Sequence, residues 1–194
     1  ERATCIGAPF LYWPAPSDPG PAGNDLLCFP YHSIPEYKIT ADWAAYARAL
    51  RVTASGHGFA RVTVCLHHHD YANVEVRRAL RGVGVAVVTA GDAFEPYFFE
   101  RLCHIIRQHA AVTSDRVCTA GLYAEVLERP FFISGDELRS DPPDPDVGLG
   151  ADQRAHLLDR DRVLRRHVLD RLALRDHRHD RRWRVLLRDL RAKR

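Results

Sequence analysis

The sequence of 194 residues contains no methionine and no long apolar segment. A membrane-spanning helix needs about 20 consecutive apolar residues, so we expect none in this chain. The first residues, ERATCIGAPFLYWPAP, lack the basic region and apolar stretch of a secretory signal. Because even an initiating methionine is missing, we expect the chain to be a piece of a longer protein.

Cysteines are few, and none forms a CxxC pair. The five of them are odd in number and widely spaced, which argues against a zinc ribbon, a redox motif or a disulfide framework. Cys28 and Cys65 stand in apolar runs, where a thiol packs as a small hydrophobic group. Unpaired thiols predict a cytoplasmic protein, with peripheral attachment to a membrane as an alternative.

Several catalytic and binding motifs are also absent. The sequence has no GxGxxG, no phosphate-loop consensus and no GxSxG, which disfavours dinucleotide binding of the usual kind and a serine hydrolase. His67, His68 and His69 stand in a row, but consecutive residues of an extended segment point to opposite sides. At most two of them should therefore share a site. With no HExxH helix either, we expect no metal and no cofactor.

Charge is distributed unevenly along the chain. Residues 151–194 contain 15 Lys and Arg against 7 Asp and Glu, whereas the 150 residues before them contain 13 against 18. The basic tract RDHRHDRRWR is interrupted by aspartates and has one aromatic residue, Trp183. A nucleic-acid-binding surface would interleave more aromatics with its basic residues, so nucleic acid is an unlikely partner.

Four segments differ in composition. Residues 1–25 are rich in Pro and Gly, which is typical of a loop. Residues 26–135 contain the regular apolar patterns of a folded domain. Residues 136–153 read as a linker, and residues 154–194 form an Arg-rich tail with two amphipathic helical stripes.

Apolar runs and helical stripes alternate between residues 26 and 135. The runs are apolar throughout, as in strands that are covered on both faces. A helix whose stripe includes Trp43 and Leu50 would be capped by Thr40 or Asp42. The pattern predicts an α/β, doubly wound parallel sheet of about five strands, followed by the helices of the tail. The predicted strands are 26–29, 61–66, 85–90, 110–112 and 131–133.

Polar side chains gather in the loops that follow the predicted strands. In an open parallel sheet the carboxyl ends of the strands form the ligand-binding edge. An imidazole or carboxylate there can deprotonate a substrate hydroxyl. The candidates for this catalytic role are His32, His69, Asp70 and Asp92. Thr89 and Gly91 are candidates for binding, because glycine permits close approach of the backbone to a ligand.

The stretch from Val112 to Ser134 contains hydroxyls and a carboxylate where a strand passes into a helix. Ser114 or Asp115 could cap that helix by accepting its free backbone N–H bonds. Ser114 and Thr119 would alternatively hold a phosphate at the positive end of the helix. The residues leave both interpretations open.

The same stretch, TSDRVCTAGLYAEVLERPFFI, resembles the C-terminal domain of GT-B-type bacterial glycosyltransferases that build surface polysaccharides. The family shows a strand, a nucleotide-facing turn, a helix with a small-residue face and a proline before the last strand. Three positions depart from its usual pattern, at Asp115, at Cys118 and at Leu127-Glu128-Arg129. The residues that fit it are Thr113, Ser114, Thr119, Tyr123, Ala124 and Pro130.

The resemblance implies transfer of a sugar from a nucleotide sugar to a glycan or lipid-linked acceptor. Such enzymes work between two doubly wound domains, so a further N-terminal domain would be missing from this chain. The expected contacts to the donor come from Thr89, Gly91, Ser114, Asp115, Thr119 and Tyr123. Two alternatives remain: a non-catalytic α/β binding module, and another nucleotide-sugar enzyme such as an epimerase.

Overall fold

A computed structural model describes residues 23–116, 118–135 and 138–141 of the chain. The loop predicted for residues 1–25 lies almost wholly outside these residues. Most of the predicted linker and all of the Arg-rich tail, residues 154–194, lie outside them as well.

Five strands form one parallel sheet in the order β4-β3-β1-β5-β6. The central strand β1 pairs on both sides, with Leu26 opposite Val62 of β3 and opposite Ala111 of β5. This arrangement confirms the predicted α/β fold with a Rossmann-like, doubly wound sheet. The strands are β1 (Asp25–Cys28), β3 (Arg61–Cys65), β4 (Ala86–Val88), β5 (Ala111–Ser114) and β6 (Phe131–Ile133).

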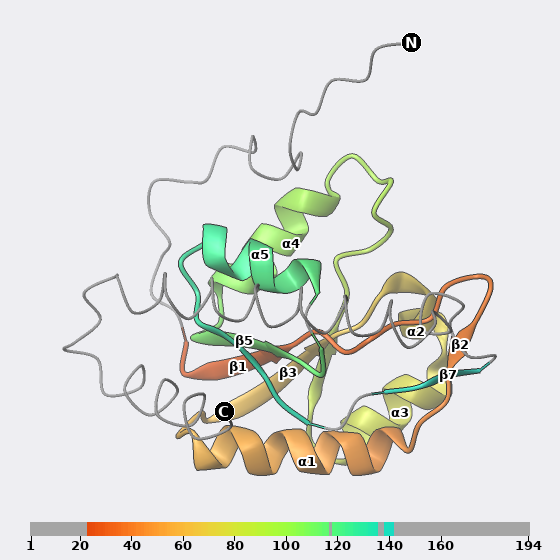
Figure 1. Cartoon of the computed structure of the whole chain (residues 1–194), viewed down its shortest axis with the longest axis horizontal. Coiled ribbons are helices and arrows are strands. Elements are labelled where there is room, and N and C mark those ends of the chain that lie inside the picture. The colour runs from red at the N-terminus through yellow and green to blue at the C-terminus, as the bar shows by residue number, and fades with distance from the viewer. Residues whose placement is uncertain (1–22, 117, 136–137, 142–194) are drawn as a thin grey trace, which may run out of the picture.

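The main helices lie in two layers, one on each side of the sheet (Figure 1). Helices α1 (Trp43–Gly56) and α3 (Val74–Gly82) cover one side. Helices α4 (Phe98–Arg107) and α5 (Thr119–Val126) cover the other. A short helix, α2 (His68–Ala72), follows β3 directly.

Each side of the sheet has its own apolar core, and the alternation of strand side chains explains why. Leu26 and Cys28 of β1 pack toward α1 and α3, whereas Leu27 packs toward α4 and α5. All three are almost completely buried. Because both faces of these strands are covered, neither face is polar throughout, which accounts for their largely apolar sequences.

The sequence predicted the start of helix α1 correctly and the start of helix α5 wrongly. Asp42 caps α1 as expected, because its carboxylate accepts the backbone N–H of Ala45 at 2.8 Å. The prediction that Ser114 or Asp115 caps the following helix is wrong. Helix α5 begins only at Thr119, and its N-cap residue, Cys118, makes no side-chain capping bond. The carboxylate of Asp115 is bound by backbone amides elsewhere.

Two further strands form a small antiparallel pair that the sequence did not predict. β2 (Lys38–Ile39) comes from the segment after β1, and β7 (Ser140–Asp141) comes from the segment after β6. Their pairing joins two segments about 100 residues apart. It fixes the course of the chain beside the carboxyl end of the central strand.

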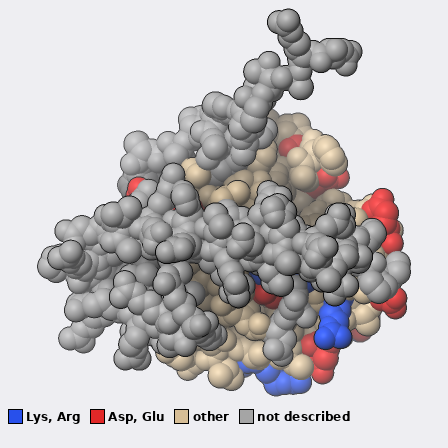
Figure 2. All heavy atoms as spheres, viewed as in Figure 1, with Lys and Arg blue, Asp and Glu red and all other residues tan. Residues whose placement is uncertain are grey.

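No helix among the described residues is long and apolar enough to cross a membrane. Where described residues are visible in Figure 2, acidic and basic side chains lie interspersed at the rim of the molecule.

Candidate functional site at the carboxyl ends of the strands

The strand order places a switch point between β1 and β5. From β1 the chain continues to β3 and β4 on one side, and β5 and β6 extend the sheet on the other. In sheets of this kind a crevice opens where neighbouring strands send their connections to opposite faces. The loops after β1 and β5, together with the loop after β3, therefore form the candidate site.

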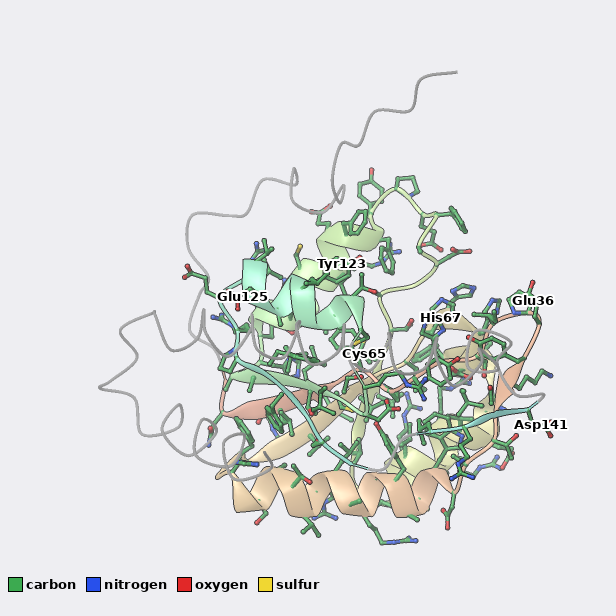
Figure 3. The ribbon with its side chains drawn as sticks, viewed as in Figure 1. Glu36, Cys65, His67, Tyr123, Glu125 and Asp141 are labelled. Atoms are coloured by element: carbon green, nitrogen blue, oxygen red, sulfur yellow. The ribbon has the colours of Figure 1, made fainter. Side chains whose placement is uncertain are left out.

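Four imidazoles gather where β3 and β1 end. The ring of His32, after β1, stacks on that of His67, after β3, with centroids 4.2 Å apart and planes 13° apart. His68 and His69 follow, and their centroids lie 4.3 and 5.2 Å from that of His67. Figure 3 shows His67 at this end of the sheet, next to the connection that bears Glu36. We call His32, His67, His68 and His69 the histidine cluster.

The expectation that at most two of the three consecutive histidines share a site is wrong. One nitrogen from each of His67, His68 and His69 lies within 4.8 Å of the others. The expectation assumed an extended segment, but the backbone turns into helix α2 at His68. The alternation of side chains therefore ends at His67, so one nitrogen of each ring can lie close to the other two.

His67 favours the neutral imidazole. Burial, and after it the neighbouring His32, His68 and His69, lower the pKa of His67 to about 4, whereas Asp92 opposes the shift. The Nδ1 atoms of His67 and His68 are buried and have no hydrogen-bond partner within the part of the chain that the structure describes. Nitrogens of this kind are free to accept a proton or to bind a metal ion.

His32 is oriented by its own loop. Its Nδ1 lies 3.1 Å from the carbonyl oxygen of Ser33, which can only accept, so this nitrogen carries the hydrogen in the bond. In the neutral ring the lone pair is then on Nε2. A half-buried imidazole with a free Nε2 can serve as a general base.

Asp70 holds the loop after β1 in place. Its two carboxylate oxygens accept the backbone N–H of Ser33 at 2.8 Å and the hydroxyl of Ser33 at 2.5 Å. The same hydroxyl accepts the N–H of Ile39 at 2.9 Å. Asp70 is buried, with 5% of its surface exposed. Both of its oxygens are bound to Ser33, which suits a positioning role better than proton transfer.

Asp92 approaches the cluster from the loop after β4. One oxygen accepts the N–H of Phe94 at 3.0 Å, and the other lies 4.0 Å from Nε2 of His68. Thr89 accepts the N–H of Gly91 through its hydroxyl. Gly91 adopts a positive φ of 88°, which favours glycine, so the turn that presents Asp92 depends on it.

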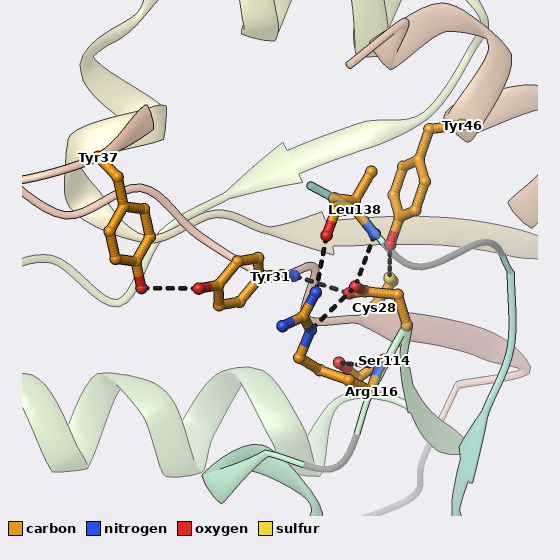
Figure 4. Close-up of polar contacts among 8 residues, drawn as sticks. Cys28, Tyr31, Tyr37, Tyr46, Ser114, Arg116 and Leu138 are labelled. Carbon is orange, nitrogen blue, oxygen red and sulfur yellow. Dashed lines mark hydrogen bonds and ion pairs between the residues drawn. The ribbon is translucent and has the colours of Figure 1, made fainter. Parts of the chain in front are cut away.

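A second set of contacts closes the loops at the switch point (Figure 4). Asp115, after β5, accepts the N–H of Tyr31 at 2.7 Å and the N–H of Leu138 at 3.2 Å. Arg116 lies 3.6 Å above the ring of Tyr31 and donates to the carbonyl oxygen of Leu138. One buried carboxylate thus ties together the segments that follow β1, β5 and β6.

The remaining candidates lie along β5 and α5. Ser114 is 1% exposed, and its hydroxyl accepts the N–H of Arg116 at 3.5 Å. Thr119 is exposed at the first turn of α5. Tyr123 is half-buried against Phe99, and burial raises its pKa. Figure 3 shows Tyr123 in the helical layer, away from His67.

The structure thus divides the candidates into two groups on one edge of the sheet. His32, His69, Asp70 and Asp92 come together around His67. Ser114, Asp115 and Thr119 lie around the end of β5, and Tyr123 stands a turn further along α5.

Sequence reasoning missed three residues at this edge: Tyr31, Ser33 and Arg116. Tyr31 and Ser33 flank His32, and Arg116 follows Asp115 directly, so each stands beside a residue that was singled out. Their position next to those residues was the available signal, but the partners of Ser33 and Tyr31 are 37 and 84 residues away, respectively.

The buried cysteines are structural, as expected for thiols in apolar strands. The Sγ of Cys28 lies 3.2 Å from the hydroxyl of Tyr46, and burial raises the pKa of the Cys28 thiol far above its ordinary value. Burial also raises the pKa of Cys65 to about 12. Such thiols are neutral and unreactive at physiological pH.

Comparison with known proteins identified no relatives: no protein-family model, curated protein or solved structure matches this chain.

Proposed function

We propose that the α/β unit is the donor-binding domain of a GT-B-type glycosyltransferase, which transfers a sugar from a nucleotide sugar to a glycan or lipid-linked acceptor. The observation that supports this most is the course of the chain through β5, α5 and β6. Ala120, Gly121 and Ala124 give α5 the small buried face that the resemblance implies, and Pro130 stands directly before β6.

The donor phosphates would bind at the start of α5. The first amides of a helix have no partner within the helix, and Cys118 supplies no side-chain cap. These amides and the exposed hydroxyl of Thr119 suit a phosphate. Ser114 is buried, so its contribution is to shape the turn through the amide of Arg116.

The acceptor hydroxyl would be deprotonated by an imidazole of the histidine cluster. His32 is the preferred base, because its Nδ1 is bound to the carbonyl of Ser33 and its Nε2 bears the lone pair. His69 is the exposed alternative. Asp70 fixes the loop that holds His32. GT-B enzymes use two doubly wound domains, and the described residues form one, so the second domain would complete the cleft.

Calorimetric titration of the full chain with nucleoside mono- and diphosphates and nucleotide sugars tests the proposal. We expect saturable binding of at least one nucleotide, weakened in Thr119→Val. Thr53→Val is the matched control, because Thr53 lies in the last part of α1, near the opposite edge of the sheet. A folded protein that binds none of these ligands would contradict the proposal.

One observation favours a second candidate, a non-catalytic α/β binding module. The buried carboxylates of Asp70 and Asp115 are engaged by loop amides, so much of the polar edge serves to hold its own loops. This candidate predicts that His32→Ala and Ser114→Ala leave the function of the intact protein unchanged. Loss of sugar transfer in His32→Ala, with nucleotide binding retained, would exclude it.

A further inference from the structure

We propose that His67, His68 and His69 bind a divalent first-row transition-metal ion such as Zn²⁺, with Asp92 orienting His68. The proposal does not depend on the glycosyltransferase assignment, whose preferred base, His32, is none of these three residues. A metal-bound His69 would not serve as the alternative base.

The first support is the convergence of three imidazole nitrogens within 4.8 Å of one another. Zinc binds imidazole at about 2.0–2.1 Å, which places two ligands of a tetrahedral ion roughly 3.3 Å apart. Small side-chain rotations therefore bring the three nitrogens to ligand spacing. Imidazole is a preferred ligand of Zn²⁺, Cu²⁺ and Ni²⁺, whereas Mg²⁺ and Ca²⁺ prefer oxygen.

The second support is a pair of buried nitrogens without partners. Nδ1 of His67 and Nδ1 of His68 have no hydrogen-bond partner among the described residues. Burying a polar atom without a hydrogen-bond partner is unfavourable, and such atoms are rare in native proteins. Coordination through Nδ1 would satisfy both atoms, so we assign these nitrogens as the ligands from His67 and His68.

The third support is the carboxylate of Asp92. Its Oδ2 lies 4.0 Å from Nε2 of His68, on the nitrogen opposite the one that we assign to the metal. Histidine ligands commonly donate their second N–H to a carboxylate, which fixes the ring and makes it a stronger ligand. Gly91, at a positive φ, shapes the turn that brings Asp92 to this position.

Three histidines leave a tetrahedral ion one open position for water or a substrate oxygen. Catalytic zinc sites have this composition, whereas structural zinc sites are closed by a fourth protein ligand. His32 stacks on the ring of His67, so its side chain lies next to a ligand of the proposed site. An ion held there would lower the pKa of a bound water toward neutrality.

Calorimetric titration of the untagged full chain with Zn²⁺ tests the proposal. We expect one equivalent to bind, with the affinity falling by more than 100-fold in His69→Ala, since even loss of an outer-sphere partner costs roughly 10- to 100-fold. The loss of Zn²⁺ affinity in Asp92→Asn should lie within that range of roughly 10- to 100-fold. His69 is exposed, so its replacement leaves the metal-free fold intact, which thermal unfolding without metal verifies.

Two control variants separate this site from other histidines. His104→Ala removes an exposed imidazole from α4, on the opposite layer, and should leave Zn²⁺ binding unchanged. The tract RDHRHD contributes His177 and His179, which lie outside the described residues. The double variant His177→Ala/His179→Ala should also still bind one equivalent of Zn²⁺.

Metal binding at this site can be tested without any measurement of nucleotide binding. A visible Co²⁺ absorption spectrum typical of a four-coordinate ion with three imidazole ligands and one oxygen ligand, lost in His68→Ala and His69→Ala, would support the site. The proposal would be overturned if the wild-type chain bound Zn²⁺ no more tightly than His69→Ala. It would equally be overturned if His177→Ala/His179→Ala abolished the binding.

Discussion

At the scale of single residues, the polar edge of the sheet contains two kinds of side chain with different tasks. The buried carboxylates of Asp70 and Asp115 accept backbone N–H bonds from loops far away in sequence. The imidazoles of the histidine cluster, in contrast, have nitrogens available for chemistry. The carboxylates hold the loops in place, whereas buried imidazole nitrogens of His67 and His68 have no hydrogen-bond partner among the described residues.

Replacing Asp115 by Asn should destabilise the fold. The amide side chain retains one acceptor but turns an NH₂ group toward a backbone donor, either that of Tyr31 or that of Leu138. A buried donor left unsatisfied costs about 1–3 kcal/mol in the free energy of unfolding. Urea unfolding measures this loss in the free energy of unfolding. Glu36→Gln, an exposed change in the connection after β1, should stay within about 0.5 kcal/mol of wild type. Equal stability of the two variants would contradict the role assigned to Asp115.

His109 should make stability depend on pH. It is 7% exposed, and its Nδ1–H donates to the carbonyl oxygen of Ile105 at 2.7 Å. Burial lowers the pKa of His109 below the ordinary 6.5, although the hydrogen bond to Ile105 and the nearby Asp25 oppose this effect; Arg61 adds to it. As pH falls below 6.5 the unfolded chain takes up the proton first, so stability is lost from that point downward.

The comparison is between wild type and His109→Gln, unfolded by urea at a series of pH values between about 7.5 and 5. The variant lacks this titrating group, so its stability should fall less steeply over the interval. Parallel pH profiles for the two proteins would show that His109 contributes nothing to the dependence.

At the scale of elements, α5 is defined by the small residues on its buried face. A Cβ atom built on Gly121 would lie 2.9–3.1 Å from three carbons of the Phe131 ring, closer than van der Waals contact allows. The helix can approach β6 only because that position has no side chain. The same close packing is what the resemblance to glycosyltransferases implies for this segment.

Gly121→Ala should therefore destabilise the protein by about 1–3 kcal/mol through overpacking against Phe131. The matched control is Gly82→Ala at the end of α3, where a Cβ atom meets nothing within 4 Å. That change should stabilise slightly, by about 0.4–1 kcal/mol, because alanine restricts the unfolded chain. Thermal or urea unfolding distinguishes the two. Opposite signs are expected, and a neutral Gly121→Ala would contradict the packing.

Long apolar patterns made most elements predictable from sequence. The strand at 61–66 and the helix that includes Trp43 and Leu50 are both found, because burial on two faces and helical periodicity leave clear signals. Helix α2 was not predicted, since HHHDY has no apolar stripe. The pair β2–β7 was missed because two-residue strands carry no pattern and exist only through their tertiary pairing.

At the scale of the whole molecule, sequence alone did not specify strand order. The five parallel strands are similar short apolar runs, and nothing in β1 indicates that β5 is its second neighbour. The candidate site was predicted as an edge of the sheet, which follows from the α/β alternation. Its contacts, such as Ser33 with Asp70, depend on which strands are adjacent and were out of reach.

The arrangement predicts a gradient of local stability. Strand β1 is paired on both sides and covered by helices on both faces, whereas within the described part of the chain β2 and β7 pair only with each other. Native-state hydrogen exchange should show the amides of Leu27, Val64 and Val112 among the slowest. The amides of β2 and β7 should exchange earlier, by local opening. Equal protection of Ile39 and Leu27 would contradict this.

The place of β1 also constrains the order of events during synthesis. Leu26 leaves the ribosome before its partner Ala111, which lies 85 residues later, so one side of the central strand stays unpaired until β5 has been made. Until then, β1, β3 and β4 can assemble while one edge of β1 remains unpaired, and such an edge can pair with a strand of another chain. Folding of this protein should therefore be slow for its size, and chains that are still being synthesised should tend to aggregate with one another.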